Sequence, residues 1–550
     1  MSSATATPTK RAGGTGAASP PAAHAHAHAH AHAPGTPPAA TVAEAARPAT
    51  VDYITSLVRG HHRFVCLGEA SHGTADHYAL RADLSLALLS GEGVEGGPFH
   101  AVVYESDWPP AFAANLWVRG FAGGSVGDAL APYRQSRFPT WMWANTTFAS
   151  FCERLRALNE TLPPHDRKGL YGFDIYSFAS SMAALIGYFE GAGDEAAAAA
   201  ARARYACFNE HGGGSAERYA LSIARGARGC EAAALAQLVE TMEGAREAAE
   251  AEARAAEAAV AAEGGRGGGR GDPGPASPSA AAVLARERRF DAVSNARAVA
   301  AGEFYYRAMT ARSGRDSTWN ARDASMALTV QAVEEHVRAG GVKSPRIIVW
   351  AHNSHLGRAA ASEMSARRGE TNVGQLLTQA AGREVLVIGQ LTYAGTVAAA
   401  RAWGRPVENR AVRPALPGSA EALLHEAVAS EGAPSAFALD LRPDEGPANA
   451  RLRALLAEPR RVRHVGVIYR SAPAWAEVPS HYQIACLAAP PAGEGEEEAE
   501  GAEEAEEADA YGLFDVAVFQ DVTTAVTPLD PPPGWDQVVQ PDEAVVGDEE

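Results

Sequence analysis

Phe-Val-Cys-Leu-Gly-Glu-Ala-Ser-His-Gly, residues 64–73, is the stretch of this 550-residue chain that most clearly indicates its fold. Phe64–Gly68 is a short apolar run, as expected for a strand that is covered on both faces of a parallel sheet. Glu69 and His72 follow at once, and Asp76–Leu89 then has the pattern of a helix. The segment therefore predicts a strand, a turn with ionisable side chains and a helix, which is the repeating unit of an α/β fold.

The same alternation of short apolar runs and helical stretches continues along the chain. Further strands are predicted at Ala101–Tyr104, Leu170–Phe173, Arg346–Trp350, Glu384–Gly389, Ala436–Leu441, His464–Tyr469 and Asp515–Phe519. Further helices are predicted at Thr146–Leu158, Phe178–Tyr188 and Ala321–Val337. This order favours a mostly parallel sheet flanked by helices, within one domain of residues 49–535.

The strand pattern stops between Asp174 and Arg346, where the chain is rich in Ala, Glu and Arg. We expect a helical insertion subdomain there, at about residues 178–340. A Gly-, Arg- and Pro-rich segment, residues 264–279, interrupts it and is predicted to be a flexible linker. The helix before that linker is so rich in Ala that we expect it to project into solvent.

Two low-complexity segments lie outside the predicted core. Residues 1–48 contain no Leu, Ile, Phe, Tyr or Trp, so they are predicted to form a disordered tail. Five histidines alternate with Ala at 24–32; alternate histidines can bind a transition metal, but a low-complexity expansion is the favoured interpretation. Residues 490–510 are predicted to be a disordered acidic loop, and ten acids within it account for more than half of the net charge of −18.

Composition excludes several classes of function. No basic patch suggests a nucleic-acid partner, and no apolar run approaches the length of about 18 residues that spans a membrane. The five cysteines show no CxxC spacing and are expected to be free thiols in a reducing compartment. The N-terminus has no apolar signal segment, which favours a cytoplasmic location, with an organelle transit peptide as the alternative.

Ionisable residues follow several of the predicted strands. Glu69 and His72 follow the strand quoted above, Glu105 follows the next, and Asp174 comes directly after Phe173. The strand at 346–350 is followed by a pair of histidines, His352 and His355. Because the carboxyl ends of parallel strands lie at one edge of a sheet, these side chains are expected to converge on one cleft.

The residue types suit acid–base catalysis of hydrolysis. A histidine can take a proton from water at neutral pH, and a neighbouring carboxylate can orient its ring. Arg81 lies one to two turns into the following helix, from where it could pair with Glu69 or Glu105 or stabilise an anionic intermediate. Asp174 is predicted to contact the substrate.

A serine esterase and a metal-dependent hydrolase are the two alternatives to this prediction. Gly123-Gly124-Ser125-Val126-Gly127 matches the G-x-S-x-G motif of serine esterases, but the preceding residues have the pattern of a helix end rather than of the required strand. The glutamates and histidines could also bind zinc, manganese or iron, although the chain contains no HExxH motif.

At these residues the chain resembles the erythromycin esterase family. The similar stretches are LGEASHGT at 67–74, YESD at 104–107, YGFD at 171–174, RDASMA at 322–327, VWAHNSH at 349–355, NVG at 372–374 and FDVAVF at 514–519. The GExxHG and WAHNxH stretches, in this order, are the specific part of the resemblance. It covers roughly residues 50–530, apart from the two insertions.

The resemblance implies a hydrolase that opens the lactone ring of macrolides by attack of water, with no metal or other cofactor. His72 matches the general base of the family, and Glu69, Arg81, Glu105, His352 and His355 match the rest of its site. A retained site supports hydrolysis of an ester or lactone more strongly than it supports erythromycin, and a macrolide substrate would imply a role in the response to antibiotics. The alternatives are a non-catalytic member that binds a small molecule and a metal-dependent hydrolase.

Overall fold

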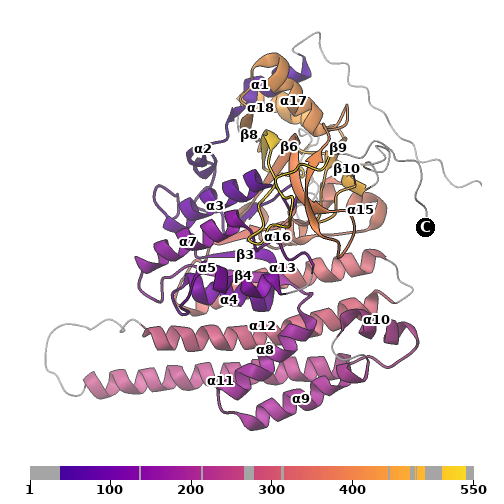
Figure 1. Cartoon of the computed structure of the whole chain (residues 1–550). Coiled ribbons are helices and arrows are strands. Elements are labelled where there is room, and N and C mark those ends of the chain that lie inside the picture. Colours follow the sequence, from indigo (N-terminus) through magenta and orange to yellow (C-terminus); the bar gives the residue numbers. More distant parts are fainter. Residues whose placement is uncertain are drawn as a thin grey trace, which may run out of the picture. The chain divides into compact units, whose positions relative to one another are not determined.

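The fold is seen in a computed structural model that describes residues 37–540, apart from 136–137, 212–214, 265–277, 311–314, 444–445, 471–476, 478–479 and 490–510. A nine-stranded sheet forms its centre, with the strand order β1-β8-β11-β6-β2-β5-β3-β4 and β7 paired with β6 (Figure 1). Its members are β1 (Arg47–Pro48), β2 (Phe64–Leu67), β3 (Ala101–Asp107), β4 (Gly169–Asp174), β5 (Ile347–Trp350), β6 (Val385–Ala400), β7 (Val407–Val412), β8 (Ala436–Asp440) and β11 (Val516–Thr523). The five pairings from β11 to β4 are parallel, and those of β1, β7 and β8 are antiparallel, so the expected mostly parallel α/β sheet is confirmed.

The central strands are buried on both faces. Val65 and Leu67 of β2 belong to one apolar cluster, whereas Phe64 and Cys66 belong to the cluster on the other face, as the two-residue period of a strand requires. Two sets of helices cover the faces. The first contains α2 (Val51–Ser56), α3 (Ala75–Ser90), α4 (Trp108–Val118) and α7 (Thr146–Glu160), and the second contains α13 (Arg315–Ala339), α16 (Val373–Ala381), α17 (Ala420–Glu431) and α18 (Gly446–Leu456).

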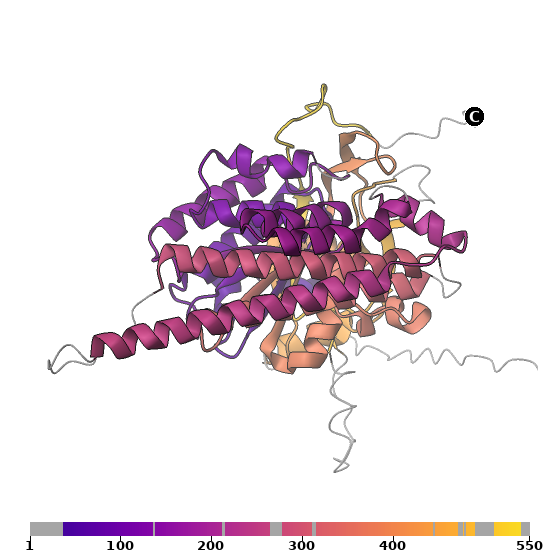
Figure 2. The same cartoon turned by 90° about the horizontal axis from the view of Figure 1, so that it is seen from below.

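Helices alone fill the described chain between β4 and β5. They are α8 (Phe178–Gly191), α9 (Glu195–Glu210), α10 (Ala216–Ala224), α11 (Glu231–Gly264), α12 (Ala280–Ala308) and α13. Helices α11 and α12 run side by side, and the far end of α11 extends beyond its neighbours, with residues 249–255 exposed (Figures 1 and 2). Helix α13 differs from the other helices of this group because it packs directly on β3, β4 and β5, and so it helps to cover one face of the sheet.

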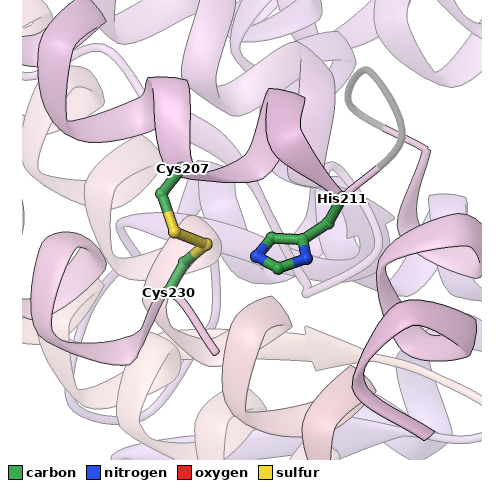
Figure 3. Close-up of side chains that lie close together, drawn as sticks. All are labelled: Cys207, His211 and Cys230. Carbon is green, nitrogen blue, oxygen red and sulfur yellow. A yellow bond between two sulfur atoms is a disulfide. The ribbon is translucent and has the colours of Figure 1, made fainter. Parts of the chain in front are cut away.

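The cysteines differ from the expectation of five free thiols. Cys207 and Cys230 form a disulfide between the end of α9 and the residue before α11, beside the ring of His211 (Figure 3). Their Cα atoms are 5.9 Å apart although 23 positions separate them in sequence, so helix packing rather than local sequence creates the pair. The remaining three, Cys66, Cys152 and Cys486, are free.

Two other expectations need correction. Residues 38–45 of the predicted tail form helix α1 (Pro38–Ala45), because Ala favours helix and Val42 is fully buried near α17 and α18. The strand predicted at His464–Tyr469 is absent from the described chain; β9 (Arg460–Arg463) instead pairs with β10 (Tyr482–Ala485). Val465 instead forms backbone hydrogen bonds with Ala70 and His72. These bonds place the neighbouring His464 beside the turn that follows β2.

The low-complexity segments otherwise fall largely outside the described residues. These are residues 1–36 with the alternate histidines, most of the linker at 264–279, and the acidic loop at 490–510. Within the described part of the chain, no helix is both long and apolar enough to cross a membrane.

Candidate active site

The strand order brings four of the site-bearing strands together. β2, β5, β3 and β4 are successive parallel neighbours, although β5 comes last of the four in sequence. Leu67 of β2 and Tyr104 of β3 are both register partners of Trp350 in β5. The residues that follow these three positions therefore lie at the same height along the strands. Glu69, Glu105, Asp174 and the His352–His355 turn therefore meet at one edge.

His72 is fixed in the turn after β2. Its backbone N–H donates to Val465 O (3.2 Å), and the Tyr78 hydroxyl donates to His72 O (2.8 Å). Its Nδ1 lies 3.0 Å from Glu69 Oε1, whereas its Nε2 lies 4.0 Å from Glu105 Oε1. Glu69 therefore orients the ring with Nε2 on the side of Glu105.

Arg81 lies behind Glu69 and away from the cavity. Its Nη2 is 2.6 Å from Glu69 Oε2, and neither side chain is exposed to solvent. The contact is an ion pair without hydrogen-bond alignment, and the guanidinium also lies over the rings of Tyr78 and Trp350. Of the two roles weighed for Arg81, this placement matches the pairing with Glu69.

Glu105 is the centre of the site. It accepts hydrogen bonds from Arg322 Nη2 (2.9 Å) and from the His352 backbone N–H (3.0 Å), and its Oε1 lies 3.4 Å from His355 Nε2. Burial alone would raise the pKa of Glu105, but His355, His72 and Arg322 hold that pKa well below its usual range. Glu105 is therefore a buried carboxylate anion.

His355 is held between two acids. Its Nδ1 lies 2.9 Å from both carboxylate oxygens of Asp323, and the Trp319 indole stacks on the ring with centroids 4.6 Å apart. Burial lowers the pKa of His355, but Asp323 and Glu105 outweigh it and raise that pKa above its ordinary value. Nε2 has a partner in either state, because it can donate to Glu105 or accept from Arg322 Nη1 at 3.0 Å.

His352 is a neutral histidine. Its Nδ1 accepts from the Ser354 backbone N–H (3.2 Å) at the start of α14 (Asn353–Leu356), and its ring lies 4.8 Å from that of His72. Burial, together with His72 and His464, lowers the pKa of His352 well below its ordinary value. Burial likewise lowers the pKa of His464 to about 3.

These groups line a cavity of about 410 Å³. His72, Glu105, His352 and His355 reach it from the strand ends, and Asp174 lines it while binding Arg322 through both carboxylate oxygens (2.8 and 2.9 Å). Tyr176, Trp319, Trp403, Met142 and Val467 supply aromatic and apolar walls. The cavity thus combines acid–base groups with apolar surface that could hold an organic substrate.

The sequence interpretation missed the contribution of α13. Arg322 and Asp323 lie in a stretch that supported the family resemblance, but neither was assigned to the site. A charged Arg-Asp pair within an Ala-rich helical stretch was the available signal. His464 was also missed, because only the pairing of residues 465 with 70 and 72 brings it to the site.

The two rival sites have different geometry. Ser125 caps the short helix α5 (Val126–Ala129), is bound by Asp128 Oδ2 at 2.7 Å, and follows a helix and a turn rather than a strand. At the sheet edge, the Arg322 guanidinium lies 2.9–3.0 Å from Glu105 and His355, where it would repel a metal ion. Among the described residues, the three-ligand group spaced for a metal is Cys207, His211 and Cys230, outside this cavity, and its two cysteines are joined in the disulfide.

Comparisons with known proteins agree with this architecture. A succinoglycan biosynthesis protein of known structure is 14% identical, with a TM-score of 0.58 over 90% of this chain and 98% of that one. A Bacillus cereus protein is 15% identical with the same TM-score and coverage, and a mutant of the erythromycin esterase EreC in its open conformation is 16% identical, with a TM-score of 0.49 over 87% and 95% of the two chains. The sequence pattern of the erythromycin esterase family matches residues 94–489, well over half of the chain. This chain belongs to the erythromycin esterase family.

Proposed function

We propose that this protein hydrolyses a carboxylic ester or a macrolide-type lactone by attack of a water molecule that His72 activates. Family membership supports an ester-bond hydrolase of macrolide esters. The observation that carries the mechanism is the alignment Glu69–His72–Glu105, in which one carboxylate holds Nδ1 and the opposite nitrogen is directed at the cavity side. With the Nδ1 proton donated to Glu69, Nε2 is free to act as a base.

In the first step, His72 Nε2 takes a proton from water while the water oxygen bonds to the carbonyl carbon of the ester. Negative charge then develops on the carbonyl oxygen. Arg322, a permanent cation, and His355, as a proton donor, line the cavity near Glu105, and they would stabilise this charge. Arg81 acts indirectly in this scheme, because it holds Glu69, which in turn orients His72.

In the second step, the carbon–oxygen bond of the ester breaks and the leaving alkoxide takes a proton from His355 Nε2. The raised pKa of His355 suits this role, because Asp323 and Glu105 favour the protonated ring. Glu105 lies between the two histidines, 4.0 Å from His72 Nε2 and 3.4 Å from His355 Nε2. It can therefore stabilise His72 after the first step and His355 before the second. The products are an acid and an alcohol, and exchange with solvent then removes the proton from His72 and returns one to His355.

The reaction is tested by incubating the full chain with a panel of macrolides and simple esters and measuring products by mass spectrometry. For at least one substrate, we expect the hydrolysis products to contain one water more than the substrate. When the reaction is run in ¹⁸O-water, the new acid group should contain one ¹⁸O atom. Tight binding without turnover across the panel would support the non-catalytic alternative instead. Turnover that disappears on removal of a stoichiometric metal would support the metal-dependent alternative.

A further inference from the structure

A second cavity lies at the opposite edge of the sheet from the candidate active site. It has a volume of about 330 Å³ and is reached from the amino ends of β3 and β4, where His100 precedes Ala101 and Lys168 precedes Gly169. The ends of α7 and α13 complete its walls with Leu158, Leu162 and Val337. The groups assigned to hydrolysis lie at the carboxyl ends of these same strands, so the two cavities are separate.

Lys168 is the unusual residue of this cavity. It is 7% exposed, and its backbone is held on both sides by Asn159, at 2.6 and 3.0 Å. Across the described residues, no hydrogen bond or ion pair engages its ammonium group. Burial lowers the pKa of Lys168, with Asp166 opposing that effect. Lys168 lines the cavity, so a ligand that supplies negative charge there would favour the charged form of its amine and bind to it.

The surrounding charges have a positive excess, because Arg119, Arg167, Lys168 and Arg286 line the cavity together with two acids, Asp166 and Glu287. No carboxylate of the described residues lies within 4.0 Å of Arg167; its guanidinium donates to the carbonyl oxygens of Arg119 and Leu162 instead. Arg286 reaches Glu287 only at 3.9 Å, because Arg119 and His336 already occupy that carboxylate at 2.6 and 2.7 Å.

His100 adds a neutral donor. Its Nδ1 accepts the Arg346 backbone N–H at 3.1 Å, so the proton of the neutral ring lies on Nε2. Burial and the charge of Lys168 lower the pKa of His100 to about 4, which keeps the ring neutral at physiological pH. An anion in the cavity would therefore meet cations and an N–H donor together.

We propose that this cavity is a second, non-catalytic site that binds a small organic anion, with its phosphate or carboxylate group paired to Lys168 and its apolar part against Leu158, Leu162 and Val337. The volume is near the lower end of small-molecule sites, which limits the ligand to a compact molecule. The proposal does not depend on hydrolysis of an ester.

The lysine content of the chain makes a direct test feasible. The sequence holds three lysines, Lys10, Lys168 and Lys343, so the full chain labelled with ¹³C at lysine Cε has three lysine signals in a two-dimensional NMR spectrum. Each signal reports the titration of its own amine. Phenyl phosphate, benzoate and inorganic phosphate serve as probes. Comparing phenyl phosphate with benzoate shows which anionic group the site prefers, and comparing phenyl phosphate with inorganic phosphate shows what the apolar ring contributes to binding.

We expect the Lys168 signal of the free protein to titrate below the ordinary lysine range, because burial lowers the pKa of Lys168. Saturation with phenyl phosphate or benzoate should raise the pKa of Lys168 by about one unit or more, because an opposite charge within contact distance favours the ammonium form. In calorimetry, Lys168→Met should weaken binding at least tenfold, while Lys343→Met should leave it unchanged. Inorganic phosphate should bind more weakly than phenyl phosphate.

The proposal is wrong if none of the three anions moves the Lys168 signal at millimolar concentration. It is also wrong if binding persists in Lys168→Met but is lost in His355→Ala, because the anion then occupies the first cavity. The titration uses the unaltered chain, so it decides the matter even if Lys168→Met does not fold.

Discussion

Among the residues of the site, His72 is distinguished by the different surroundings of its two ring nitrogens. Glu69 holds Nδ1 at 3.0 Å, whereas Nε2 faces Glu105 across 4.0 Å. We expect His72→Ala to lower turnover by about 10²–10⁴-fold, the usual contribution of a general base, and to leave the fold intact. Steady-state kinetics and thermal unfolding on one preparation measure both effects. Near-wild-type turnover in the folded variant would rule out the proposed base.

Asp323 controls a second histidine. Because Asp323 and Glu105 raise the pKa of His355, an acid role for His355 places the alkaline fall of activity above the ordinary histidine pKa of 6.5. Asp323→Asn removes one negative charge but keeps an acceptor for His355 Nδ1. We therefore expect the alkaline limb of the kcat profile to move to lower pH.

Thermal unfolding of Asp323→Asn, measured on the same preparation, is the control. A variant that is less stable but has an unchanged alkaline limb would show that Asp323 only packs against His355.

At the scale of elements, the Cys207–Cys230 disulfide ties the end of α9 to the start of α11. It closes a loop of 23 residues, and Cys230 N donates to the Tyr219 hydroxyl at 2.9 Å. A loop of this length restricts the unfolded chain enough to stabilise the fold by about 3 kcal/mol. Cys207→Ser should lower the free energy of unfolding of the helical part by roughly that amount in urea titrations.

The wild-type protein treated with a thiol reductant provides the matched comparison. It should unfold like Cys207→Ser, and the variant itself should not respond to the reductant. Equal unfolding midpoints for oxidised and reduced wild-type protein would contradict the stabilising role.

At the scale of the whole molecule, buried histidines make stability depend on pH. Burial is the largest cause that lowers the pKa values of His62 and His464 to about 3 and those of His77 and His481 to about 4. Between those values and 6.5, the unfolded chain binds protons that the folded chain does not. Stability that is present above pH 6.5 is therefore lost as the pH falls, by roughly 1 kcal/mol per pH unit for each such histidine.

Urea unfolding at pH 7.5, 6 and 5 measures this loss. His355 acts in the opposite sense, because its raised pKa contributes stability at low pH that is lost as the pH rises. One histidine of this kind does not offset these four together with His100 and His352, whose pKa values are also lowered, so we expect the free energy of unfolding to fall on acidification. A constant or rising value between pH 7.5 and pH 5 would contradict the neutral state of these rings.

The α/β class and the positions of most strands were predictable, because they are local properties of the chain. Phe64–Leu67 and Ile347–Trp350 are buried on both faces and therefore consist of apolar residues throughout. The carboxylates and histidines directly after these strands were predictable for the same reason. The strand expected at 464–469 was wrong, because Val465 pairs with the turn after β2 and Ile468 pairs with the last residue of β6, as two isolated bridges rather than one continuous ladder.

Local patterns in the chain were enough to predict a mostly parallel sheet and to place Glu69, His72, Glu105, His352 and His355 after its strands. The position of β5 between β2 and β3, the arrival of Arg322 and Asp323 on α13 at the same edge, and the pairing of Cys207 with Cys230 became visible only in the folded chain. The difference lies in the distance along the sequence over which each interaction acts. Burial and periodicity act between neighbours in sequence and leave a readable pattern, whereas strand order, a salt bridge over 217 positions and a disulfide depend on how distant segments pack.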